Sequence, residues 1–250
     1  SHNVYCDNYQ ISTKIYKEVR TIFYKEKMNN NHNPQIKAII FDIGGVLALG
    51  KDSIQIRGRT KGVHADITKK LGVSLDQWFD TIGEIYEKTI IGKSSEKEFL
   101  SFNSKTFGKS TSFIKNLFLR TYKAHFRQNI PLYNFAFKLK KKRYIIAILS
   151  DQHQISKQAV MPKDKIRYFS PVIVSCDVGM RKPEIGIYRL ILQKLNLNPT
   201  RVVFIDNQEW NLAPAKRLGI HTILFKNNKQ LFKQLEQLGV KLKCLQSEPK

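Results

Sequence analysis

The sequence lacks long hydrophobic runs and has few cysteines. Without about 18 consecutive apolar residues, no membrane-spanning helix is expected. No apolar segment near the N-terminus indicates a secretory signal. The 3 cysteines, Cys6, Cys176 and Cys244, are odd in number and far apart in the chain. This pattern is not that of a disulfide framework, and the cysteines do not have the spacing of metal ligands. It favours a reducing compartment, so we predict a cytoplasmic protein.

Acidic residues are also scarce, since 20 Asp and Glu stand against 43 Lys and Arg, for a formal net charge of +23. Such a field attracts phosphate esters, nucleic acid or an anionic membrane. The charge is spread along the chain, and only "KLKKKR" (138–143) is a tight cluster. No alternation of basic and aromatic residues indicates a nucleic-acid groove. Two explanations of the positive charge therefore remain equal. One is contact with an anionic membrane or nucleic acid, and the other is a simple Lys-rich bias in composition. The sequence does not indicate an oligomeric state.

The chain is long enough for one large core, with 250 residues of which 42% are hydrophobic. Residues 1–34 are predicted to be an N-terminal extension. Within it, 11–28 has apolar residues at helical spacing and predicts an amphipathic helix, either packed on the core or lying on a membrane or partner. Residues 51–127 have a helical pattern throughout and few β-branched alternations. In this segment Ser95 and Glu98 have the spacing of a capping box.

Elsewhere, short apolar runs alternate with amphipathic segments. The expected strands are 36–41, 144–150, 171–176, 201–206 and 221–225, and the expected helices between and after them are 185–197, 213–219 and 228–238. Continuous apolar strands that alternate with helices predict a doubly wound parallel α/β sheet. We assign residues 35–50 and 128–250 to this core, and 51–127 to a helical subdomain inserted into it.

Polar residues follow several of the expected strands. Asp42 follows "AIIF", Ser150 follows "IIAIL", Asp206 and Asn207 follow "VVFI", and Lys182 lies in the loop after another strand. One such residue is more often a helix cap, but the whole set is harder to explain in that way. Ligands bind beyond the carboxyl ends of parallel strands. A carboxylate can attack phosphorus, while a lysine and a hydroxyl hold the phosphoryl oxygens and Mg²⁺ offsets their charge.

The segments around these residues resemble the four motifs of the haloacid dehalogenase-like (HAD) hydrolases. "FDIGGVL" resembles the first motif, "AILSDQ" the second, "VGMRKPEIGIY" the third and "VVFIDNQEWNLAPAKRLGIHTILF" the fourth, in the family's order and spacing. The resemblance covers residues 36 to 226. The predicted helical insert lies between the first two motifs, where this family carries a helical cap. The resemblance implies a Rossmann-like core with an inserted α-helical cap.

The resemblance also implies a role for each strand-end residue. Asp42 would be the nucleophile, Ser150 would hold the phosphoryl group, and Lys182 would bridge that group and the nucleophile. The ligands of Mg²⁺, or of Mn²⁺ in its place, would be Asp42, the backbone carbonyl of Gly44, Asp206 and Asn207.

Two positions depart from the pattern of the family's phosphatases. A second Asp usually stands two residues after the nucleophile and protonates the leaving group, but this chain has Gly44 there. General-acid catalysis is typically worth about 10²–10⁴-fold in rate. Asn207 stands where a second acid is usual in the fourth motif, and it offers the metal a dipole in place of a charge. We therefore expect impaired activity, weak metal binding, and a preference for leaving groups of low pKa, such as those of sugar-1-phosphates or aryl phosphates.

Three hypotheses of function follow. The first is a Mg²⁺-dependent phosphatase that acts on a small phosphorylated substrate through an aspartyl-phosphate. The second is a non-catalytic basic module of this fold that binds a phosphorylated ligand, a membrane or nucleic acid. The third is a metal-free 2-haloacid dehalogenase, because dehalogenases of this family lack the general acid and need no metal, in agreement with Gly44 and Asn207. The retained polar strand ends favour catalysis over the second hypothesis.

Overall fold

The computed structural model describes residues 35–50, 55–56 and 59–240. The chain divides into two compact units, Ser1–Gln35 and Ile36–Lys250, and the fold described below is that of the second. The predicted N-terminal extension, with its helix at 11–28, lies outside the described residues. Among the residues that are described, no helix is both long and apolar enough to cross a membrane.

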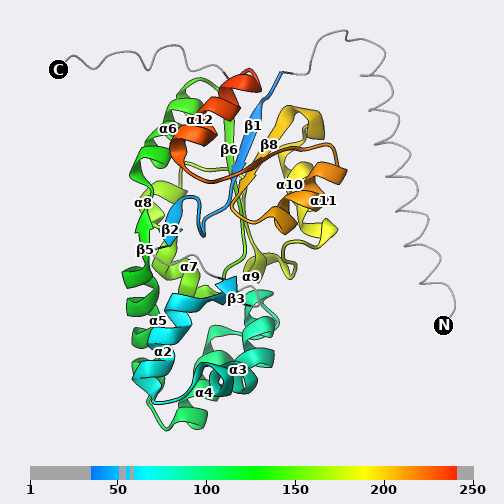
Figure 1. Cartoon of the computed structure of the whole chain (residues 1–250). Coiled ribbons are helices and arrows are strands. Elements are labelled where there is room, and N and C mark those ends of the chain that lie inside the picture. The colour runs from blue at the N-terminus through cyan, green and yellow to red at the C-terminus, as the bar shows by residue number, and fades with distance from the viewer. Residues whose placement is uncertain (1–34, 51–54, 57–58, 241–250) are drawn as a thin grey trace, which may run out of the picture. The chain divides into compact units, whose positions relative to one another are not determined.

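A five-stranded parallel sheet forms the core of this unit (Figure 1). In spatial order its strands are β7 (Val172–Val174), β6 (Ile145–Ser150), β1 (Ala38–Phe41), β8 (Val202–Asp206) and β9 (His221–Leu224). The central strand β1 pairs with β6 on one side and β8 on the other. All residues of β1 and β8 are buried, which explains why β1 is apolar throughout and why β8 is apolar up to its last residue, Asp206. The predicted parallel α/β sheet is confirmed.

Helices cover both faces of the sheet. One face carries α6 (Ile130–Lys141), α7 (Gln154–Val160) and α12 (Asn228–Gln237). The other carries α10 (Ile185–Leu195) and α11 (Glu209–Arg217). Successive residues of a strand point to opposite faces. Ile39 and Phe41 of β1 accordingly pack in the first layer, and Ala38 and Ile40 pack in the second.

The described part of residues 51–127, which precedes α6, is largely helical and is called the cap below (Figure 1, cyan to green). Its helices are α2 (Lys61–Leu71), α3 (Leu75–Ile90), α4 (Glu96–Phe107) and α5 (Thr111–His125). The predicted capping box is present at the start of α4. The Glu98 backbone N–H donates to Ser95 Oγ, and the Ser95 backbone N–H donates to the Glu98 carboxylate. Phe99 and Phe118 meet edge to face between α4 and α5.

The helical part of the insert begins at Lys61, ten residues later than the sequence pattern predicts. Short strands precede it: β2 (Ala48–Gly50), β3 (Gln55–Ile56) and β4 (Arg59–Thr60). β2 pairs antiparallel with β5 (Phe126–Gln128), where the chain returns to the core. The two segments that join the cap to the core are therefore hydrogen-bonded to each other.

One predicted strand is shorter in the structure, and one predicted helix begins earlier. The strand expected over 171–176 ends at Val174, because Ser175 starts the short helix α9 (Ser175–Val178). The Ser175 hydroxyl hydrogen-bonds to the backbone N–H and carbonyl of Gln152. The helix expected over 213–219 is α11, which begins earlier, at Glu209, and ends at Arg217. The remaining short helices are α8 (Lys163–Ile166) and the 3₁₀ helix η1 (Pro199–Arg201).

Candidate active site

The carboxyl ends of three adjacent strands bring the predicted residues together. Asp42 follows β1, Ser150 ends β6 and Asp206 ends β8. Lys182 reaches the same place from the loop between α9 and α10. Its Nζ lies 2.6 Å from Asp206 Oδ2 and 3.1 Å from Asp42 Oδ1. Each of these four residues is at most 6% exposed. The order of the strands, with β1 between β6 and β8, therefore creates one buried polar cluster.

Asp151 holds the loop that delivers the lysine. Its Oδ1 accepts the backbone N–H of Lys182 at 3.1 Å, and its Oδ2 lies 4.0 Å from Nε of Arg181. Burial raises the pKa of Asp151, an effect that Lys182 and Arg181 partly offset. Asp151 thus fixes the loop through its side chain, although the sequence alone gave it no assigned role.

The carboxylate of Asp206 is enclosed by donors from the protein. Besides Lys182 Nζ, Asn211 Nδ2 donates to both oxygens at 3.2 and 3.1 Å, and the backbone N–H of Gln208 donates to Oδ1 at 2.8 Å. We predicted Asp206 as a metal ligand. Its partners favour a different role, as the counter-ion that positions Lys182 and the start of α11.

Electrostatics set the protonation states of the nucleophile candidate and its partner. Burial raises the pKa of Asp42 to about 7, against the opposing effect of Lys182, while Asp206 raises it further. A hydrogen bond from Ser150 favours the ionised form. Burial lowers the pKa of Lys182, but the carboxylates of Asp206 and Asp42 outweigh it and the net direction is upward. Lys182 therefore stays charged, and Asp42 can ionise near neutral pH.

The turn after β1 contains two glycines with different surroundings. Gly45 has φ 82°, and a Cβ there would lie 2.3 Å from Nδ2 of Asn207, so the turn needs glycine at this position. At Gly44, by contrast, the nearest atom to an added Cβ is Nε2 of Gln152, at 4.0 Å. A side chain at position 44 would thus enter open space beside Asp42, whereas one at position 45 would collide with Asn207.

The cluster offers a small set of oxygen donors to a metal. The described residues contain no group of three His, Cys, Asp or Glu side chains placed to hold an ion. Asn207 Oδ1, however, is buried and has no hydrogen-bond partner among the described residues. An unpaired buried acceptor costs about 1–3 kcal/mol, and a cation would supply its partner. Together with Asp42 and the Gly44 carbonyl, Asn207 fits Mg²⁺, which prefers oxygen ligands, with a low total ligand charge.

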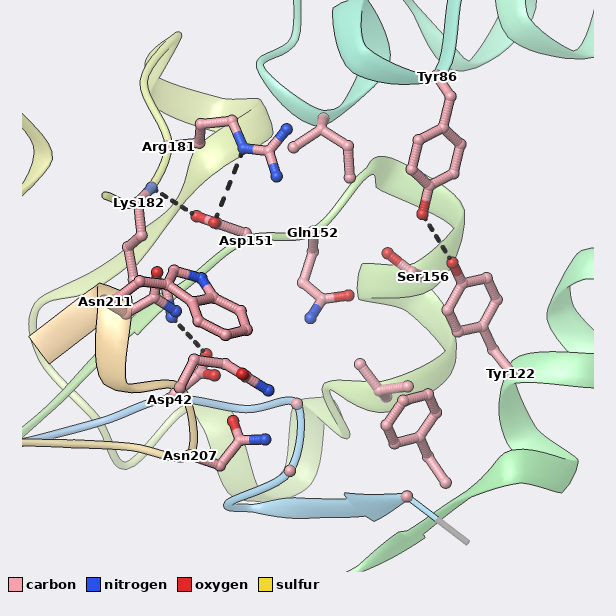
Figure 2. Close-up of a pocket in the computed structure, with 18 of the residues that line it drawn as sticks. Asp42, Tyr86, Tyr122, Asp151, Gln152, Ser156, Arg181, Lys182, Asn207 and Asn211 are labelled. Carbon is pink, nitrogen blue, oxygen red and sulfur yellow. Dashed lines mark hydrogen bonds and ion pairs between the residues drawn. The ribbon is translucent and has the colours of Figure 1, made fainter. Parts of the chain in front are cut away.

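A cavity of about 160 Å³ lies above this cluster (Figure 2). The core lines it with Asp42, Lys182, Asn207 and the exposed ring of Trp210. The cap contributes Tyr86, Glu87, Ile90, Tyr122 and Phe126. The cavity therefore has a polar floor at the strand ends, and aromatic rings form much of its remaining wall.

Contacts across the cavity connect the cap to the core. Arg181, next to Lys182, forms an ion pair with Glu87 of α3. Within the cap, the hydroxyls of Tyr86 and Tyr122 are hydrogen-bonded at 3.1 Å (dashed line in Figure 2). The Tyr122 hydroxyl also lies 3.3 Å from Nε2 of His153 in the core. Burial lowers the pKa of His153 to about 3, so this histidine stays neutral within the aromatic cluster.

Several residues that line the cavity are not among the site residues predicted from the sequence: Gln152, Arg181, Tyr86, Tyr122 and Trp210. For Gln152 and Arg181 a signal exists, because each is within two residues of a predicted site residue. The tyrosines carry no such signal. Aromatic residues at helical spacing have the same pattern whether they fill a core or face a cavity.

Comparison with known proteins agrees with the fold. A family model described as haloacid dehalogenase-like hydrolase matches residues 36–219. Bifunctional epoxide hydrolase 2 of Mus musculus is 31% identical over 171 residues, which cover 66% of this chain and 29% of that protein. (S)-2-haloacid dehalogenase 4A of Burkholderia cepacia is 32% identical over 87 residues, which cover 34% of this chain and 38% of that one. The chain spans less than a third of the length of the epoxide hydrolases it matches.

A solved structure is similar over most of the described unit. It is that of HAD family enzyme BT-2542 from Bacteroides thetaiotaomicron, in complex with magnesium and inorganic phosphate. The TM-score is 0.62 at 23% sequence identity, and the match covers 79% of this chain and 99% of that one. At this identity the likeness is one of fold.

Proposed function

Because this chain belongs to the haloacid dehalogenase-like hydrolases, we propose that it is a phosphatase that acts on a small phosphorylated substrate, with Asp42 as the nucleophile. The observation that carries this proposal is the position of Lys182 Nζ, within 3.1 Å of both Asp42 and Asp206 at the strand ends. A buried ammonium beside a carboxylate of near-neutral pKa can both keep the nucleophile ionised and receive an anionic group.

The reaction proceeds in two balanced steps. An Asp42 oxygen attacks phosphorus, and the bond from phosphorus to the leaving-group oxygen breaks with its electron pair, leaving an aspartyl-phosphate. Water then attacks phosphorus, and the bond from phosphorus to the Asp42 oxygen breaks, so that its electron pair returns to the Asp42 carboxylate as inorganic phosphate leaves. The proton that the water loses passes to solvent. Throughout, Lys182 and the Ser150 hydroxyl hold phosphoryl oxygens. Mg²⁺, when held by Asp42, the Gly44 carbonyl and Asn207, supplies positive charge against the repulsion between carboxylate and phosphate.

The residues at Gly44 and in the cavity walls favour aryl phosphates as substrates. Gly44 provides no acid to protonate the leaving group, so esters whose alcohol has a low pKa react without that help. Tyr86, Tyr122 and Trp210 line the walls, and aromatic rings favour flat partners through stacking or edge contacts. Aryl phosphates and sugar-1-phosphates satisfy the first condition, and aryl phosphates also satisfy the second.

The test is a screen of phosphate release from an aryl phosphate and a panel of phosphometabolites, with Mg²⁺, with Mn²⁺ and with a chelator. We expect metal-dependent release that is fastest for aryl esters and absent in Asp42→Asn. Brief incubation should also label Asp42 with phosphate, detected by mass spectrometry of the digested protein. No release from any ester, with either metal, would refute the proposal.

The second candidate is a metal-free 2-haloacid dehalogenase. Among the described residues, no three His, Cys, Asp or Glu side chains are placed to hold a metal ion, which favours this candidate. Gly44 and Asn207, at positions that phosphatases fill with acids, favour it as well. Asp42 would attack the halogen-bearing carbon and expel halide, and water would hydrolyse the resulting ester. Halide release from 2-chloropropionate in the presence of a chelator would distinguish it. A non-catalytic basic module would bind phosphate and be inactive in both assays.

A further inference from the structure

We infer that the side chain of Gln152 occupies the place of the missing general acid, and that it donates an amide N–H to the oxygen of the leaving group. This inference rests on the proposed phosphatase function. It assigns a substrate contact to a residue outside the strand-end cluster of Asp42, Lys182 and Asp206.

The geometry at Gly44 carries the inference. Nε2 of Gln152 lies 4.0 Å from the point where a Cβ of residue 44 would be, in ordinary van der Waals contact. The space that the side chain of an acid at position 44 would enter is thus next to the Gln152 amide. Gln152 also lines the cavity, and Figure 2 shows its side chain pointing inward, between Asp42 and Tyr122. Gln152 lies in the loop that follows β6, whereas Gly44 lies in the turn that follows β1.

Neighbouring contacts hold this amide in position. The backbone N–H of Gln152 donates to Ser175 Oγ at 3.0 Å, and the Ser175 hydroxyl donates to the backbone carbonyl of Gln152 at 3.3 Å. The side-chain Nε2 donates to Ser150 Oγ at 3.3 Å. Ser150 in turn hydrogen-bonds to Asp42. Gln152 is only 9% exposed, so both its backbone and its side chain are constrained.

An amide nitrogen carries two N–H groups. With one directed to Ser150, which holds the phosphoryl group, the second is available to the oxygen that departs from the same phosphorus. A neutral donor placed there stabilises the negative charge that develops on that oxygen. It does not transfer a proton, because an amide is far too weak an acid near neutral pH. The leaving group therefore departs as its anion, and water protonates it afterwards.

The test compares Gln152→Ala and Gln152→Glu with the wild-type protein on a series of substituted phenyl phosphates. Gln152→Ala should lower kcat/KM by at least about tenfold for the poorest leaving group and less for the best, because the lost hydrogen bond matters most where charge on the oxygen is greatest. Gln152→Glu should flatten the dependence on leaving-group pKa, and its rate should fall at high pH as the new acid ionises. An equal loss on all esters in Gln152→Ala would mean that Gln152 acts only through Ser150, and would overturn the inference.

A binding measurement separates this inference from the proposed function. Orthovanadate has an apical oxygen at the leaving-group position that inorganic phosphate lacks, so it mimics the transition state. With Mg²⁺ present, calorimetry should show that Gln152→Ala weakens vanadate binding at least about fivefold more than phosphate binding, even if the wild-type protein hydrolyses no phenyl phosphate. Equal weakening of both anions, no weakening, or a wild-type protein that binds neither anion would each overturn the inference.

Discussion

Lys182 Nζ lies 2.6 Å from Asp206 Oδ2, and both side chains are almost fully removed from solvent. The two residues are 24 positions apart in sequence and come from different elements, a loop and the end of β8. Asp206 is therefore the fixed anion that draws the lysine into the site, where the same ammonium reaches Asp42 at 3.1 Å.

This ion pair predicts a large cost for removing one partner. Asp206→Asn keeps the shape of the side chain but leaves a buried lysine with less negative charge around it, and we expect a loss of about 3–5 kcal/mol of unfolding free energy. Asp177→Asn is the matched control, because the pair between Lys157 and Asp177 is about one-third exposed and should contribute about 1 kcal/mol or less. Urea denaturation measures both. Similar losses in the two variants would contradict the assigned role of Asp206.

The raised pKa of Asp42 predicts a pH effect on stability in metal-free protein. An ordinary Asp titrates near 3.8, and burial raises the pKa of Asp42 to about 7. Between these values the folded protein keeps a proton that the unfolded chain loses. The stability that this proton contributes is thus fully present below about pH 4 and is lost as pH rises through about 7.

Asp42→Asn does not titrate, so it isolates this contribution. With a chelator present, we expect the melting temperature of the wild-type protein to fall relative to that of Asp42→Asn as pH rises from about 4 to 7, and to level off above. Mg²⁺ should oppose the fall, because it favours the ionised carboxylate. A constant difference between the two proteins over this pH range would show that Asp42 has no raised pKa.

Asn207 predicts weak metal binding. Its Oδ1 is a buried acceptor without a hydrogen-bond partner among the described residues, and as an amide it gives a cation no charge. Asn207→Asp should tighten Mg²⁺ binding about tenfold or more, equivalent to about 1.4 kcal/mol. Gln208→Glu adds the same charge at the neighbouring residue that lines the cavity and serves as the control. Calorimetry with Mg²⁺ should show a smaller gain for Gln208→Glu. Equal gains would indicate a general charge effect instead of ligation.

The open space at Gly44 predicts that a general acid can be introduced at this position. Because the nearest atom to an added Cβ is 4.0 Å away, we expect Gly44→Asp to fold with little change in stability. It should raise turnover of alkyl phosphates relative to aryl phosphates, by up to about 10²-fold, since it can protonate the leaving group. Gly45→Asp is the control, because its positive φ and its contact with Asn207 make a side chain costly there. Should Gly44→Asp leave the ratio of alkyl to aryl turnover unchanged, the missing acid is not what limits the rate.

Much of the fold follows from local sequence patterns. Apolar runs such as "YIIAILS" and "RVVFID" are typical of buried parallel strands, and the structure has β6 and β8 there. The segment around Ser95 and Glu98 has a capping-box spacing, and α4 starts there. These predictions succeed because strand burial and helix capping depend on residues a few positions apart. The extents were less accurate at Ser175, whose hydroxyl bonds to a backbone 23 residues away.

The polar residues that end the strands, and the order of those strands along the chain, could be read from the residues alone. The position of Lys182 between Asp42 and Asp206, the ion pair of Arg181 with Glu87 across 94 residues, and the Gln152 amide beside the space at Gly44 became visible only in the folded protein. Periodicity reports which face of an element is buried, whereas a contact between distant segments depends on how whole elements pack. The roles of Asp206 and Gln152 could therefore be proposed only once the strand ends and the cap had been brought together.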